Sequence, residues 1–180
     1  MSRMTPACYA EAVTPSRVSV HFGDASPLSP LERVIFSSNG SLQRVLSALY
    51  NSDIDVVLVK NIARPSTPAT TANAGNGSPE WCVDREINLV YEGKVVCVAK
   101  SALTITNPEY YDLLITQSVG IGQFFRRVGV LPAFDLLEFE KPAAPSDMWR
   151  LYSLSCPGVV CVIHETYPHW IADPSQCPTL

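Results

Sequence analysis

Residues 81–101 read WCVDREINLVYEGKVVCVAKS, which is two β-prone runs joined by the turn dipeptide Glu92-Gly93. This pattern predicts an antiparallel hairpin, because the glycine can adopt the positive φ that a tight turn requires. Side chains alternate between the two faces of a strand, so every second residue shares a face. The expected core face of the first strand combines apolar residues with one arginine: Arg85, Ile87, Leu89 and Tyr91.

A two-residue turn would put Arg85 directly across from Lys100. Like charges in that position repel by about 0.2–1 kcal/mol when exposed, and by more when they are desolvated. Burying a charge without a partner is costly, so we expect an anion there, either a protein carboxylate or a ligand carboxylate. We therefore hypothesise that the hairpin forms the floor of a site for a small carboxylate. Two alternatives remain open: both side chains could reach solvent along their apolar stems, or a one-residue change of register could separate them.

Residues 148–167 predict a second hairpin, and its last strand carries Glu165 on the face expected to be apolar. Arg150 could lie across from Glu165 and form an ion pair with it. Alternatively, a carboxylate in an apolar pocket would have a raised pKa and could act as a general acid or base. His164 is expected on the opposite face of the strand.

Residues 119–122 read VGIG and lie between two predicted helices. Gly120 and Gly122 would allow the backbone to approach a ligand closely. The N–H groups around Ile121, at the start of the next helix, could bind an anion. The alternative is an ordinary turn between two helices.

The remaining patterns predict the fold class. We expect six strands, at residues 54–62, 81–91, 94–105, 131–140, 148–156 and 159–167, and the first of them should be largely buried. We expect helices at residues 27–36, 41–51, 107–116 and 123–128, with Ser29 as the N-cap of the first and Pro30 at its first position. Tight hairpins imply antiparallel pairing, and one helical layer over one sheet buries one face. The predicted fold is therefore α+β, with a six-stranded antiparallel sheet and helices packed on one face.

The length of 180 residues suits a single domain, which we expect at residues 27–170. A flexible lead-in is expected at residues 1–26 and a C-terminal tail at residues 171–180. Residues 64–79 are rich in Pro, Thr, Ala and Asn and predict a long loop, either a lid or a simple insertion. The net charge of −4 argues against a nucleic-acid partner, and an anionic ligand would need local cations.

No stretch approaches the run of about 18–20 apolar residues that spans a membrane. The first 17 residues lack the apolar core of a signal peptide, so we expect a cytoplasmic protein without a membrane partner, either a monomer or a small homo-oligomer. The six cysteines lack zinc-ligand spacing, and neither a metal nor a structural disulfide is expected. Cys97 and Cys161 lie in apolar runs and should be buried thiols.

Several short motifs follow the order and spacing of the chorismate lyase (chorismate pyruvate-lyase) family, so that residues 27–170 resemble that family and its relatives. They are SNGSLQRVL from Ser38, REINL from Arg85 followed by Gly93, the Ala99-Lys100-Ser101 triplet, VGIG from Val119 and ETYP from Glu165. The resemblance implies a six-stranded antiparallel sheet with the ligand enclosed under helical flaps. It also implies cleavage of chorismate to 4-hydroxybenzoate and pyruvate without a metal or an organic cofactor.

The resemblance assigns roles to four positions. Arg85 would grip a carboxylate, and Glu165 would lie beside the ring hydroxyl. A backbone N–H at Ile121 would help to hold the ring carboxylate, and Lys100 would be a second basic position. Chorismate is a dianion, so its two carboxylates would neutralise the two opposed cations, Arg85 and Lys100. The candidate site is therefore catalytic Arg85 and Glu165 with substrate-binding Lys100, Gly120, Ile121 and Arg150.

Three features depart from the family pattern. Lys100 stands where the best-known lyases have arginine, Gly120 stands where the family often has proline, and the loop at residues 64–79 is unusually long. One alternative is a diverged relative that catalyses elimination, dehydration or cyclisation of another small carboxylate. Another is a ligand-sensing module, similar in fold to the effector-binding domains of bacterial transcription regulators. No basic helix-turn-helix segment precedes residue 27.

Overall fold

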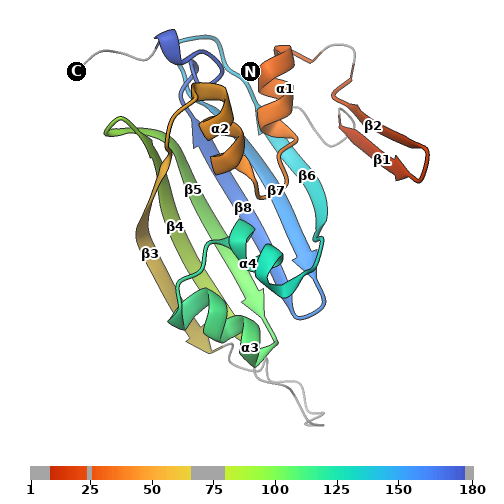
Figure 1. Ribbon diagram of the computed structural model, residues 1–180, viewed down its shortest axis with the longest axis vertical. Coiled ribbons are helices and arrows are strands. Elements are labelled where there is room, and N and C mark those ends of the chain that lie inside the picture. The colour runs from red at the N-terminus through yellow and green to blue at the C-terminus, as the bar shows by residue number, and fades with distance from the viewer. Residues whose placement is uncertain (1–8, 24–25, 66–79, 177–180) are drawn as a thin grey trace.

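The computed structural model describes residues 9–23, 26–65 and 80–176. Its main feature is a six-stranded antiparallel sheet with the strand order β3-β4-β5-β8-β7-β6 (Figure 1). The strands are β3 (Asp55–Pro65), β4 (Trp81–Tyr91), β5 (Lys94–Ile105), β6 (Ala133–Glu140), β7 (Met148–Cys156) and β8 (Val159–Tyr167). The predicted fold class is therefore confirmed, and the predicted loop at residues 64–79 lies largely outside the described residues.

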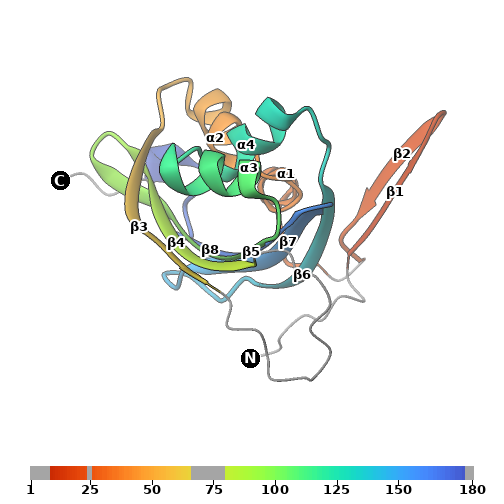
Figure 2. The same ribbon diagram turned by 90° about the horizontal axis from the view of Figure 1, so that it is seen from below.

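Helices cover one face of the sheet (Figure 2). They are α1 (Pro30–Phe36), α2 (Leu42–Tyr50), α3 (Pro108–Tyr111) and α4 (Ile121–Val128), and a π-helical turn at Asp112–Thr116 continues α3. Helix α1 begins with the predicted cap, in which Ser29 and Glu32 form a capping box and Pro30 takes the first position. No helix among the described residues is long and apolar enough to cross a membrane.

The hairpin of β4 and β5 has the predicted two-residue turn, since Glu92 and Gly93 both have positive φ. The register then changes between Leu89 and Val90, because a bulge adds one residue to β5. Leu89 pairs with Cys97, and Arg85 pairs with Ser101 instead of Lys100. The predicted pairing of Arg85 with Lys100 is therefore wrong.

Strand β3 corrects a second expectation. It forms one edge of the sheet, and its apolar side chains are about half exposed, with Val57 at 48% and Ile62 at 48%. The unbroken apolar run had indicated a largely buried strand. An edge strand has a neighbour on one side only, and here the helical layer leaves it largely uncovered.

The domain core reaches beyond its predicted ends. Residues Ala10–Thr14 (β1) and Arg17–His21 (β2) form a separate two-stranded hairpin in what was expected to be a flexible lead-in. Phe22 is only 5% exposed, and its ring contacts that of Phe139 at 5.9 Å. Ile171 is also buried, and its carbonyl accepts a hydrogen bond of 2.8 Å from the Tyr50 hydroxyl.

Candidate functional site

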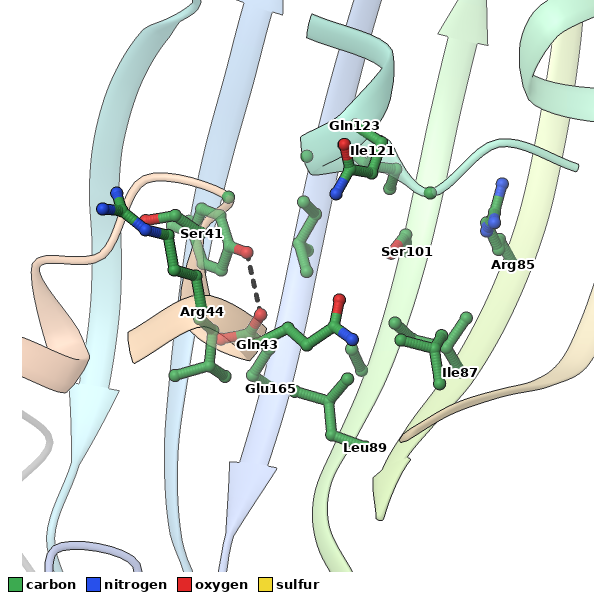
Figure 3. Close-up of a pocket in the computed structure, with 18 of the residues that line it drawn as sticks. Ser41, Gln43, Arg44, Arg85, Ile87, Leu89, Ser101, Ile121, Gln123 and Glu165 are labelled. Carbon is green, nitrogen blue, oxygen red and sulfur yellow. Dashed lines mark hydrogen bonds between the residues drawn. The ribbon is translucent and has the colours of Figure 1, made fainter. Parts of the chain in front are cut away.

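A cavity of about 130 Å³ lies between the sheet and the helices. Residues of β3, β4, β5, β7 and β8 line one side of it, and residues of α2 and α4 line the other. Figure 3 shows Arg85 and Arg44 on opposite sides of this space, with Glu165 between them. The predicted residues Arg85, Glu165, Gly120 and Ile121 all line this cavity.

Arg85 points inward from β4 and is only 5% exposed. Its Nη1 donates to the carbonyl oxygens of Leu114 at 3.2 Å and Val119 at 2.9 Å, and its Nη2 donates to that of Ser118 at 3.3 Å. These carbonyls belong to the segment that leads from α3 to α4. Backbone therefore satisfies part of the guanidinium, and this segment fixes its position over the cavity.

None of the ion pairs formed by the described residues involves Arg85. Burial lowers the pKa of its guanidinium, because the charged form loses hydration. An arginine nevertheless stays protonated in proteins. Arg85 is thus a buried cation whose charge no carboxylate of the described chain neutralises, which is the situation that we expect where an anionic ligand binds.

Glu165 points into the same cavity from β8, directly across from Arg150 on β7. Its Oε2 accepts from Arg150 Nε at 2.8 Å and from the Tyr167 hydroxyl, and it lies 2.7 Å from Arg150 Nη2 in an ion pair. Its Oε1 accepts from the Tyr152 hydroxyl at 2.8 Å. The predicted ion pair between Arg150 and Glu165 is therefore confirmed.

These donors decide what Glu165 can do. Burial, together with the negative charge of Glu165, raises the pKa of the Tyr152 hydroxyl well above its ordinary value, and burial raises that of Tyr167 as well. Both phenols therefore remain donors. Arg150, Tyr152 and Tyr167 therefore all direct donors at the two oxygens of this carboxylate and fix its position at the cavity. Oε1 accepts from one protein donor among the described residues, so it can accept another from a ligand.

Arg150 lies behind Glu165 and does not line the cavity. It is fully buried, and its Nη1 donates to the carbonyl oxygens of Phe36 at 2.6 Å and Ser38 at 2.9 Å. Its Nη2 also donates to Ser38 Oγ at 3.0 Å. The predicted substrate-binding role of Arg150 is therefore wrong: its donors are engaged by the protein, and its function is to fix Glu165 and to join the sheet to the end of α1.

Lys100 is the second correction to the candidate site. The bulge in β5 puts it on the open face of the sheet, where it is exposed and pairs in register with Glu86 and His164. His164 also lies on that face, as predicted, and its ring stacks on Trp149 at 5.2 Å. Lys100 therefore cannot contact a ligand held beside Arg85 inside the cavity.

Gly120 is the N-cap of α4, and Ile121 is the first residue of that helix. No side chain caps this end, so the first N–H groups of α4 remain available for a ligand in the cavity. Gly122 has another purpose, because an added Cβ would lie 2.0 Å from the carbonyl oxygen of Gly40. The glycine pair in VGIG thus serves the packing of α4 against the turn before α2 as well as the site.

Sequence reasoning missed several side chains that line the cavity, among them Tyr152, Arg44 and Arg126. Tyr152 could have been found, because it lies two residues from Arg150 on the same face of β7. Arg44 on α2 and Arg126 on α4 left no such signal. Each occupies the polar side of an amphipathic helix, and only the packing of the helices brings both to one cavity.

Among the described residues, no group of three or more His, Cys, Asp and Glu side chains could hold a metal ion. The four described cysteines (Cys82, Cys97, Cys156 and Cys161) are all free thiols, and Cys97 and Cys161 are buried as predicted. No protein-family model matches the chain, and no curated protein matches its sequence.

Proposed function

We propose that the protein is a chorismate lyase-type enzyme that cleaves chorismate to 4-hydroxybenzoate and pyruvate. The observation on which this rests is that Arg85, a buried cation without a carboxylate partner in the described chain, shares a cavity with Glu165. An apolar cavity with a few convergent polar groups is typical of a small-molecule site.

The ring carboxylate of the substrate binds Arg85 and the N–H groups at the start of α4. The ring hydroxyl donates to Oε1 of Glu165. Arg85 and Glu165 lie two strands apart and two residues out of register, so their Cα atoms are about 12 Å apart at ordinary strand spacings. This separation suits a ring with a carboxylate and a hydroxyl on opposite carbons.

The proposed reaction needs orientation more than proton transfer from the protein. As the C–O bond to the enolpyruvyl group breaks, the hydrogen on the neighbouring hydroxyl-bearing ring carbon moves to the enolpyruvyl methylene carbon. This yields pyruvate and an aromatic 4-hydroxybenzoate ring, and all atoms and electrons balance without an outside acid, base or oxidant. The role of Arg85 and Glu165 is to hold the dianion in the reactive geometry.

The test is to incubate the protein with chorismate and to follow 4-hydroxybenzoate and pyruvate against the uncatalysed rate. Arg85→Leu should lower kcat/KM by about 100-fold or more, because a buried charge contact to the substrate is lost. Lys100→Ala is the matched control, since it removes a cation from the other face of the same hairpin, and it should keep nearly full activity. Absence of turnover by the wild-type protein would overturn the proposal.

A second candidate is a ligand-sensing module that binds a small acid without turnover. It is favoured by the hydrogen bonds of Glu165, whose oxygens accept from Arg150, Tyr152 and Tyr167, so that the carboxylate can position a ligand hydroxyl without taking part in a reaction. A shift of the melting temperature with 4-hydroxybenzoate, together with no cleavage of chorismate, would select this candidate. Cleavage of another small carboxylic acid, but not of chorismate, would instead select a diverged relative.

A further inference from the structure

We propose that Arg44 and Arg126 bind a second carboxylate of the ligand at the mouth of the cavity. This inference rests on the proposed function, because it concerns the same cavity, but it assigns a subsite that neither predicted cation can form. Lys100 lies on the opposite face of the sheet, and Arg150 is engaged by Glu165. A dianionic ligand therefore needs another cation.

Arg44 and Arg126 both line the cavity, although they belong to different helices. Arg44 is the third residue of α2, and Arg126 lies near the end of α4. Both are exposed, in contrast to Arg85, so they border the opening of the cavity. Neither takes part in an ion pair among the described residues.

The two helix ends at the cavity add to this positive field. Helices α1 and α3 have N-terminal side-chain caps, from Ser29 and Asn107. Helices α2 and α4 begin at the cavity, and neither has a side-chain cap. Free N–H groups and the helix dipole favour an anion there, in addition to the arginines.

The charge balance points to a second anionic group. The chain as a whole carries a net charge of −4, yet Arg44, Arg85 and Arg126 meet at one cavity. Among the described residues that line this cavity, only Glu165 is acidic, and it is neutralised by Arg150. A monocarboxylate would neutralise Arg85 and leave the mouth cations without a partner. The ligand class that fits is a small acid with two carboxylates, one beside Arg85 and the other at the mouth.

Two probes isolate this second carboxylate. One is 4-hydroxy-3-methoxybenzoate, and the other is 3-carboxymethoxy-4-hydroxybenzoate, which has the same ring, hydroxyl and ether but adds the second carboxylate. Binding to the whole protein by titration calorimetry should favour the dianion by about tenfold, because the mouth is partly exposed to solvent. This preference should shrink as salt is raised, since exposed charges are screened.

The variant Arg44→Gln/Arg126→Gln should bind both probes equally, with the affinity for the monoanion unchanged. Arg127→Gln is the matched control, because Arg127 adjoins Arg126 in the same last turn of α4 but does not line the cavity, and it should keep the full preference. Equal binding of the two probes by the wild-type protein would overturn the second subsite alone, and so would a preference that survives in the double variant. Failure of both probes to bind would overturn the proposed function itself.

Discussion

Arg85 and Arg150 are two arginines that point inward from the same sheet, and they differ in what surrounds them. Arg150 is completely buried, is paired with Glu165 and lies 4.2 Å over the Tyr152 ring. Arg85 is nearly as buried, but within the part of the chain that the structure describes it donates to backbone carbonyls only. In the first arrangement, a carboxylate of the protein neutralises the charge of the arginine. The second leaves a positive charge that a ligand can neutralise, so burial by itself does not distinguish a structural cation from a functional one.

The sharpest test of this difference is the effect of each arginine on stability. Arg150→Met should lower the free energy of unfolding by about 3–5 kcal/mol, because it leaves the buried Glu165 without its counter-ion. Arg85→Met should cost less than Arg150→Met, because the charge that it removes has no carboxylate partner in the described chain and only backbone carbonyl oxygens lose a donor. Urea denaturation of both variants measures these values.

The double variant Arg150→Met/Glu165→Met is the control for this interpretation. It removes both charges of the pair and should recover much of the lost stability. Equal losses in Arg85→Met and Arg150→Met would show that the two arginines have the same structural role, and the comparison would fail.

The next effect concerns the ligand. At a 4-hydroxybenzoate concentration of 100 times Kd, the wild-type protein should gain about 2.7 kcal/mol in its free energy of unfolding. Arg85→Met should gain almost nothing at the same concentration, because the ring carboxylate loses its counter-ion. Thermal melts with and without ligand measure the gain. A ligand shift that survives in Arg85→Met would mean that the acid binds elsewhere.

The two tyrosines that donate to Glu165 allow an effect on stability to be separated from an effect on ligand binding. Tyr152→Phe and Tyr167→Phe each remove one hydrogen bond to the buried carboxylate and should each cost about 1.5–3 kcal/mol of stability. Of the two, only Tyr152 lines the cavity. Tyr152→Phe should therefore also change the affinity for 4-hydroxybenzoate, whereas Tyr167→Phe should leave it nearly constant in the same titration. Equal changes in affinity would indicate that both act through Glu165 alone.

The alternation of side chains along β4 and β8 was sufficient to predict that Arg85 and Glu165 face inward, and the helix periodicity predicted the covering layer. Lys100 was misassigned because the bulge near Val96 changes the face of every later residue in β5, and the run KVVCV contains no local signal for it. The burial of β3 depends on its place in the sheet, which is a non-local property. Arg44 and Arg126 meet only through helix packing, which no periodicity reveals.

The smallest expected effect separates the two faces of β8, where Glu165 points inward and His164 points outward. Partial burial lowers the pKa of His164, and the charge of Lys100 lowers it further. The unfolded chain, with a histidine pKa of about 6.5, therefore takes up a proton before the folded chain does. Stability contributed at this position is complete above about pH 6.5 and is lost as the pH falls through that value, because the unfolded state then binds more protons.

Urea midpoints at pH 7.5 and pH 5.5 should differ less in His164→Gln than in the wild-type protein. Lys100→Gln should also reduce the difference, but only in part, because burial still disfavours the imidazolium. An identical pH dependence in all three proteins would mean that His164 on the outward face does not contribute to the pH dependence of stability in this range.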